Sequence, residues 1–188
     1  MQRLIAAVAL LVALAAALAG CATPPPPSRE MPRLQLAPSA LGRSLNLQQH
    51  LTLQAPGREQ QLDVLLEADS RRVQLGVLAM GQLAARLDWD GKTLKEDKAS
   101  WWPQAVSGAR ILSDLQLTLW PVRAIQAALP PGWALADSGD TRTLTQDGEV
   151  VTIVRRLGPG VVEIDQQREH FKLRIESRDL GSDAQFLD

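Results

Sequence analysis

The sequence has few of the residues on which covalent and metal chemistry depend. Its 188 residues include one cysteine, two histidines and no tyrosine. A single cysteine excludes a disulfide framework and any metal site built from several cysteines. The histidines, His50 and His170, lie far apart in the chain and have no neighbouring carboxylate motif. We expect neither to act in catalysis or to bind a metal, and we expect a protein that is not an enzyme and carries no cofactor.

The sequence also lacks a basic block and the common nucleotide-binding motifs. Its formal net charge is −1, so a nucleic-acid partner is not expected. It has no glycine-rich phosphate loop and no Gly-x-Ser-x-Gly nucleophile motif. Residues 137–140 have the composition of a calcium loop without its twelve-residue pattern, and they predict a turn.

Residues 1–20 have the layout of a cleaved signal peptide, with Arg3 ahead of an alanine- and leucine-rich apolar run. The Leu-Ala-Gly-Cys sequence that ends at Cys21 resembles the bacterial lipobox, in which the cysteine becomes the new amino terminus and carries lipid. This resemblance implies that Cys21 is the lipid attachment site. Ala22 stands where an aspartate would resemble the inner-membrane retention signal. The expected location is therefore the outer membrane, lipid-anchored, on the periplasmic face.

Residues 21–42 are rich in proline, including the run from Pro24 to Pro27. Proline runs favour extended polyproline II and cannot join a sheet interior. We interpret this segment as a tether between the lipidated cysteine and a domain that begins at residue 43, with little fixed structure before that residue. A proline-rich ligand for another domain is the alternative.

Apolar and polar residues alternate over most of residues 43–178. The alternation covers 45–53, 62–68, 73–79, 83–89, 141–145, 151–153, 162–164 and 171–175. Such alternation indicates antiparallel strands with one buried face. Between residues 108 and 129 the spacing becomes helical, and Pro121 is expected at the first position of a second helix. We predict an α+β fold in which a single curved antiparallel sheet of seven to nine strands, an open or half barrel, wraps around a central helical insertion. A polar tail, 179–188, follows.

Five tryptophans gather around the predicted helices. Trp89 and Trp120 are in phase with the buried positions, and core packing explains both. The alternative is that tryptophans line an apolar cavity between sheet and helices. Trp101 and Trp102, in a predicted loop, would then lie at its mouth or at a membrane interface.

Several stretches are similar to the LolA and LolB family of periplasmic lipoprotein carriers, above all to the outer-membrane receptor LolB. They are Leu-Ala-Met-Gly-Gln-Leu at 78–83, Asp-Gly at 90–91, Leu-Trp-Pro-Val-Arg-Ala-Ile at 119–125, Leu-Pro at 129–130 and Phe-Lys-Leu-Arg-Ile at 171–175. The Leu-Trp-Pro sequence and the closing Arg-Ile are closer still to a family of LolB-like lipoproteins encoded in aryl polyene pigment clusters. The resemblance covers about residues 43–177 and is one of pattern, without a catalytic signature.

The resemblance implies an apolar cavity and a membrane-insertion turn. The in-phase residues that would line the cavity or pack its floor are Leu66, Val77, Leu87, Trp89, Leu112, Leu115, Leu119, Trp120, Ile125, Val151, Ile153, Leu173 and Ile175. In LolB an apolar residue protrudes from a turn between the third and fourth strands, and Met80, before Gly81, occupies that position here. An ordinary hairpin methionine is the alternative.

Two hypotheses follow. In the first, the protein binds an apolar, lipid-like molecule, such as an aryl-polyene lipid, and assists its transfer into the outer membrane. Its partners would be the bilayer through acylated Cys21, the apolar ligand and an envelope transport protein. In the second, the same fold has a filled core, and the protein is a structural or interaction lipoprotein of the envelope.

Overall fold

The computed structural model describes residues 31–104 and 106–181, which contain ten strands in one antiparallel sheet. The first five strands are β1 (Leu45–Ala55), β2 (Arg58–Ala68), β3 (Val73–Ala79), β4 (Gln82–Trp89) and β5 (Leu94–Lys98). The other five are β6 (Trp133–Asp137), β7 (Thr141–Gln146), β8 (Glu149–Gly158), β9 (Val161–Gln166) and β10 (Phe171–Asp179).

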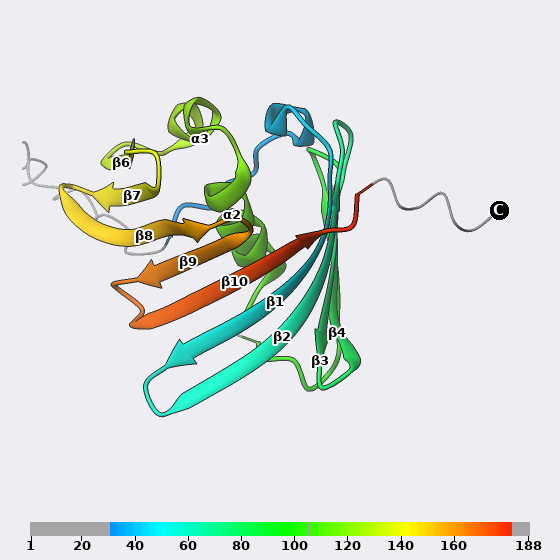
Figure 1. Ribbon diagram of the computed structural model, residues 1–188. Helices are drawn as coiled ribbons and strands as arrows, with labels where there is room; N and C mark the ends of the chain where they lie inside the picture. Colours follow the sequence, from blue (N-terminus) through cyan, green and yellow to red (C-terminus); the bar gives the residue numbers. More distant parts are fainter. Residues whose placement is uncertain (1–30, 105, 182–188) are drawn as a thin grey trace, which may run out of the picture. The chain divides into compact units, whose positions relative to one another are not determined.

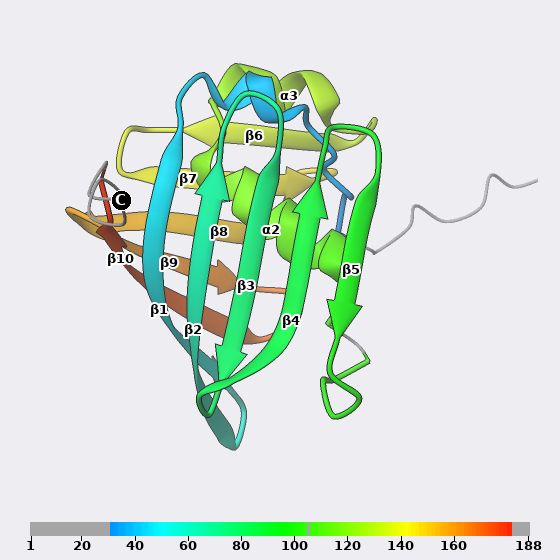
Figure 2. The same ribbon diagram turned by 90° about the vertical axis from the view of Figure 1, so that its right-hand side faces the viewer.

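The sheet consists of two meanders that meet in its middle. The strand order is β5-β4-β3-β2-β1-β10-β9-β8-β7-β6, so the first strand pairs with the last, Leu51 opposite Ile175 and Leu53 opposite Leu173. Figures 1 and 2 show the sheet curving strongly between its two edges. The chain crosses from the β5 edge to the β6 edge through the helical segment, which therefore spans the concave side.

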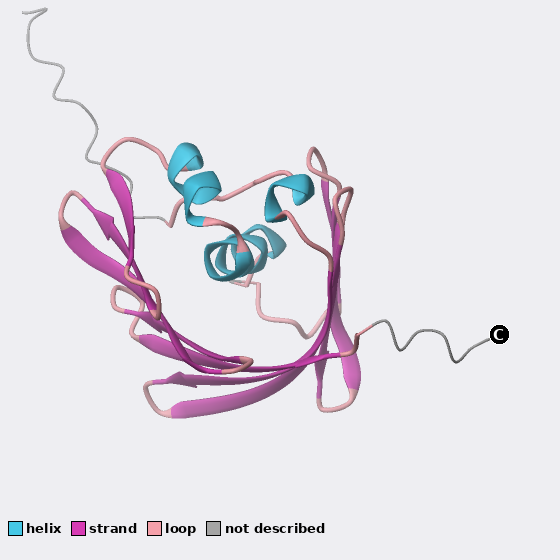
Figure 3. Cartoon of the chain, turned by 45° about the horizontal axis from the view of Figure 1, so that its top comes forward, coloured by secondary structure: helices cyan, strands magenta, loops and turns pink. Residues whose placement is uncertain are grey.

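Three short helices lie inside the curve of the sheet (Figure 3). They are the 3-10 helix η1 (Pro38–Leu41), α2 (Gly108–Leu119) and α3 (Val122–Ala128). Ser107 caps α2 by accepting a hydrogen bond from the Arg110 amide. Pro121, expected at the first position of α3, is its N-cap. Among the described residues no helix combines the length and the apolar character needed to cross a membrane.

The sheet and its central helices confirm the predicted α+β architecture, but two edge strands were not predicted. β5 has the sequence Leu-Lys-Glu-Asp-Lys and β6 the sequence Trp-Ala-Leu-Ala-Asp. Charged residues are common on edge strands because they discourage pairing with other chains, and in β5 they remove the apolar alternation that marks a strand. In β6 the alternation is weak because the strand has only five residues and alanine separates its larger apolar side chains. The described part therefore has ten strands rather than seven to nine.

A bulge in β8 makes one predicted inward residue face outward. The pairing of β7 with β8 shifts between Leu144 and Thr145, which adds one residue to β8 near Val151. Beyond the shift, Thr152 and Val154 are buried, and Ile153 between them is only half-buried and absent from the core. A one-residue shift moves every later side chain to the opposite face. The prediction that Ile153 lines the interior was therefore wrong.

The expectation of little fixed structure before residue 43 was also wrong for residues 31–42, here called the strap. Pro32, Leu34, Leu36 and Pro38 are buried, and the residues between them are exposed. The strap thus alternates like a strand, although it joins no sheet. The predicted signal peptide and the lipid attachment site Cys21 lie outside the described residues, as do residues 182–188 of the predicted polar tail.

Candidate functional site

The concave face of the sheet, with the helices and the strap against it, contains most of the residues predicted to surround a cavity. Leu66, Val77, Leu87, Trp89, Leu112, Trp120 and Ile125 are buried in one core cluster. Leu115, Leu119, Leu173 and Ile175 are partly buried and pack against that cluster. Val151 is buried beside the bulge, apart from this cluster. The structure thus brings together all of the predicted residues except Ile153 and Val151.

The strap is held in the concavity by side chains rather than by a neighbouring strand. The side-chain amide of Gln116 accepts from the Leu36 N–H and donates to the Leu36 carbonyl, both at 3.0 Å. The Leu34 N–H donates to Ser113 at 2.9 Å. The indole N–H of Trp89 also donates to the Leu36 carbonyl, at 2.8 Å, and that of Trp120 donates to Ala37 at 3.2 Å. These bonds satisfy backbone groups that would otherwise be buried without partners.

Trp89 and Trp120 are therefore packed in the core. Their apolar rings are buried and their only polar atoms bind the strap. Trp102 is buried as well and donates to the Val106 carbonyl at 3.1 Å, whereas Trp101 is 46% exposed and meets Trp102 edge to face. Of the tryptophan pair in the loop after β5, only Trp101 is available at the surface.

The half-buried part of the concave face lies over β1, β2 and β10. All four inward-facing residues of β3 are buried. By contrast, Leu51, Leu53, Leu62, Leu173 and Ile175 face the same side but keep part of their surface exposed. These five residues, here called the apolar shelf, are neighbours in the strand register. Figure 2 shows that the β1–β2 hairpin reaches beyond the end of α2.

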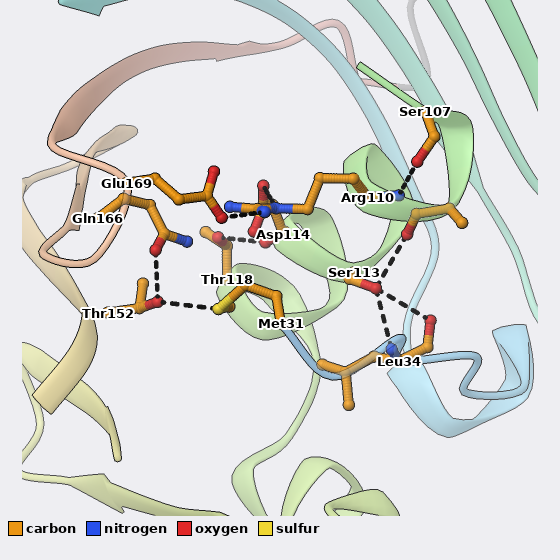
Figure 4. A network of polar contacts seen from close by, with 11 residues as sticks. Met31, Leu34, Ser107, Arg110, Ser113, Asp114, Thr118, Thr152, Gln166 and Glu169 are labelled. Atoms are coloured by element: carbon orange, nitrogen blue, oxygen red, sulfur yellow. Dashed lines mark hydrogen bonds and ion pairs between the residues drawn. The ribbon is translucent and has the colours of Figure 1, made fainter. Parts of the chain in front are cut away.

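A charged cluster lies on α2, where Arg110 and Asp114 meet Glu169 (Figure 4). The Arg110 guanidinium donates to Asp114, one helical turn later, at 2.8 Å. It also donates to Glu169, in the turn between β9 and β10, at 2.6 Å, and lies 5.9 Å from the centre of the Phe171 ring. Phe171 is two residues from Leu173 along β10 and pairs with Gln166 of β9. Arg110, Asp114, Gln166 and Glu169 are here called the polar cluster.

Burial shapes the electrostatics of the polar cluster. It raises the pKa of Asp114 to about 6, against the opposing effect of the nearby Arg110 charge. Gln166 is fully buried, and its amide oxygen accepts from the Thr152 hydroxyl at 3.0 Å. Three buried atoms have no partner among the described residues: Arg110 Nη2, Asp114 Oδ1 and Gln166 Nε2. Polar atoms buried in this way are uncommon in native proteins, so the polar cluster is a candidate ligand site.

The polar cluster was not predicted from the sequence. Arg110 and Asp114 are four residues apart, a spacing that places them on one helix face, and this signal was available. Gln166 and Glu169 reach the same place only because the β9–β10 hairpin folds against α2.

A second buried cation, Arg142, donates to the carbonyls of Leu117, Thr118 and Trp120 at the end of α2, where a positive charge stabilises the helix.

The predicted membrane-insertion turn protrudes from the sheet. Met80 and Gly81 form the two-residue connection between β3 and β4, and both have positive φ angles, of 52° and 75°. This backbone suits a tight hairpin but is unfavourable for methionine. The Met80 side chain is 90% exposed. The Ala99 amide donates to the Ala84 carbonyl, so the loop that carries Trp101 leaves the sheet at this same end.

A search of curated proteins found no match to this chain. A family model matches residues 46–179, which extend from β1 to the end of β10 and include the helices, the shelf and the polar cluster. The chain belongs to the family described as "Protein of unknown function (DUF3261)".

Proposed function

We propose that this protein is an outer-membrane-anchored periplasmic lipoprotein that binds an apolar, lipid-like molecule and assists its transfer into the outer membrane, in the manner of the LolB-like carriers that its sequence resembles. It acts without catalysis, and an aryl-polyene lipid is the cargo that the resemblance suggests. The observation that carries this proposal is the apolar shelf. It is a set of adjacent leucine and isoleucine side chains that face the concave side of an open sheet and keep exposed surface.

The energetics favour an apolar occupant of the shelf. Covering apolar surface stabilises a complex by about 25 cal/mol per Å² removed from water. An alkyl or polyene chain along β10 would cover Leu173 and Ile175 together with Leu51 and Leu53 on β1. The helices and the strap close the rest of the concave face through side chains and loops, without strand pairing, so their displacement would enlarge the site without breaking the sheet.

The exposed end of the sheet supports the transfer step. Met80, flexible and apolar, protrudes from a turn, and Trp101 is exposed in a loop at the same end. Exposed apolar side chains on protruding loops suit contact with a bilayer.

The test is photo-crosslinking in a bacterium that produces the full chain. A photoreactive phenylalanine analogue at position 173 faces the concave side, and the same analogue at position 174 provides a matched control because Arg174 faces outward on the same strand. We expect mass spectrometry to find a lipid-like adduct at position 173 and none at position 174. Equal adducts at both positions, or none at position 173, would contradict the proposal.

A second candidate function is that of a structural or interaction lipoprotein of the envelope. The tight packing of Trp89 and Trp120 against the strap favours it, because those side chains already fill the middle of the concave face. In that case position 173 yields adducts with protein and none with lipid. The same crosslinking experiment therefore separates the two functions.

A further inference from the structure

The polar cluster presents an unmet set of hydrogen-bonding groups. Arg110 Nη2 and Gln166 Nε2 are donors, and Asp114 Oδ1 is an acceptor; all three are buried and without partners among the described residues. Figure 4 shows Gln166 and Glu169 extending from the β9–β10 side toward the face of α2 that carries Arg110 and Asp114. A single group that accepts two hydrogen bonds and donates one would satisfy all three atoms.

A hydroxyl group has this capacity, since it carries two lone pairs and one O–H. The charge of the cluster selects against an ionised group. Arg110 contributes one positive charge and forms ion pairs with two carboxylates, Asp114 at 2.8 Å and Glu169 at 2.6 Å. With both carboxylates ionised, the cluster carries a net negative charge. An anionic head group would meet two carboxylates, and a cationic one would meet two unpaired donors.

The surroundings of the polar cluster suit the rest of an amphiphile. The Arg110 guanidinium stands over the Phe171 ring, and Phe171, Leu173 and Ile175 follow one another on the inward side of β10. A chain that starts at the polar cluster thus continues directly along the apolar shelf. Glu169 is 43% exposed, which leaves the cluster close to solvent.

We propose that the polar cluster binds the hydroxyl group of an uncharged single-chain amphiphile whose chain lies along the apolar shelf. This inference rests on the proposed function and adds the class of ligand to it. Arg110 and Gln166 donate to the hydroxyl oxygen, and the hydroxyl donates to Asp114. Selectivity for hydroxyl-terminated chains over plain hydrocarbon then comes from these three bonds, while the shelf contributes affinity common to both.

The test compares two photoreactive probes on the full chain in phospholipid nanodiscs. One is a twelve-carbon primary alcohol with a diazirine in the middle of its chain, and the other is the same chain ending in a methyl group. Both are supplied at equal mole fraction in the bilayer, so that partitioning into lipid does not distinguish them. We expect the alcohol to label the β10 peptide about fivefold or more above the hydrocarbon, the change typical of one or two hydrogen bonds.

Each variant removes one of the two proposed donors to the hydroxyl, along with neighbouring polar atoms. Gln166→Met keeps the side-chain length and deletes Nε2 together with the amide oxygen that accepts from Thr152. Arg110→Lys keeps the charge and replaces the guanidinium, with Nη2, by a single ammonium group. Each is expected to bring the labelling ratio close to one. The control is Gln49→Met, because Gln49 is also buried in a strand but its amide nitrogen already donates to Ser177 at 2.9 Å. The control should retain the wild-type ratio. If Gln166→Met does not fold, the labelling ratio of Arg110→Lys still tests the site, because Arg110 is partly exposed and its substitution is easier to accommodate.

The possible results are distinct. Equal labelling by both probes in the wild-type chain overturns the hydroxyl site, while the proposed function stands. A ratio that persists in both Gln166→Met and Arg110→Lys also overturns it. Labelling by neither probe overturns the proposed function together with this inference.

Discussion

Gln116 holds the strap in place, and the substitution Gln116→Leu is the most direct test of that role. The side-chain amide of Gln116 is completely buried in α2. It accepts from the Leu36 N–H and donates to the Leu36 carbonyl, as a neighbouring strand would. Leucine has a similar volume and a higher preference for the core, so the substitution removes the two bonds without leaving a large cavity.

The two lost bonds have different consequences. The Leu36 carbonyl keeps a donor in the Trp89 indole at 2.8 Å, so losing the bond from Gln116 costs about 1 kcal/mol. The Leu36 N–H has no second acceptor among the hydrogen bonds of the described residues and stays buried without a partner, at a cost of about 1–3 kcal/mol. Burial of the leucine side chain offsets part of the sum. We therefore expect the free energy of unfolding to fall by about 2–3 kcal/mol.

Urea unfolding of the full chain, followed by tryptophan fluorescence, measures the loss. Trypsin provides a local measurement, since cleavage after the exposed Arg33 in the strap should accelerate in the variant. Gln126→Leu is the control, because Gln126 lies on the surface of α3 and makes one bond, to the Leu135 carbonyl at 2.8 Å. If both substitutions cost the same, or if Arg33 is cleaved at an unchanged rate, the strap is not held as described.

Three further predictions concern single residues. Burial raises the pKa of Asp114 to about 6, so between about pH 4 and pH 6 the native state keeps a proton that the unfolded chain has released. The contribution of Asp114 to the free energy of unfolding therefore falls as the pH rises through that window, by at most about 3 kcal/mol. Asp114→Asn should remove that fall, and identical pH profiles of urea unfolding for the two proteins would contradict it. Gly160→Ala should cost more than about 2 kcal/mol, because φ is +70° and a Cβ atom would lie 2.5 Å from the Ser177 carbonyl oxygen. Gly57→Ala, with φ of +73° and open space around it, should cost only about 1 kcal/mol. Equal urea midpoints for the Gly160→Ala and Gly57→Ala variants would refute the argument that contact with Ser177 adds to the cost at Gly160. Met80→Asn should raise the free energy of unfolding by about 0.5 kcal/mol, because asparagine tolerates the positive φ of the turn; a lower urea midpoint would show that the methionine side chain stabilises the fold.

The strap illustrates how a strong local signal concealed a weaker one. Its prolines favoured an extended, unfixed tether, but residues 38–41 form a 3-10 helix and every second residue from Pro32 to Pro38 is buried. Leu34 and Leu36 alternate with exposed residues as strand residues do, and that alternation was present in the sequence. It predicts one buried face, but not that Ser113, Gln116 and two indoles would take the place of a neighbouring strand.

The polar cluster shows the opposite case. Asp114 and Gln166 belong to segments far apart in the chain, and each has a helix or strand pattern with nothing unusual about it. The raised pKa of Asp114 and the unpartnered amide nitrogen of Gln166 arise only because the β9–β10 hairpin packs against α2 and buries both side chains. Ile153 likewise depends on a bulge, because one added residue in β8 reversed a phase that the sequence alone indicates correctly at Val162 and Leu173.

The sequence by itself determined the alternating strands, the central helices and the apolar face, because period-two and helical spacing record which side of each element is buried. The alternating segments 73–79 and 83–89 also indicate a short connection between two strands, and the structure places Met80 and Gly81 in a two-residue turn there. Only the tertiary structure decided which apolar residues fill the core and which form the half-exposed shelf, where the strap lies, and that four polar side chains converge beside Phe171. Those properties depend on contacts between elements distant in the chain, and no local pattern encodes them.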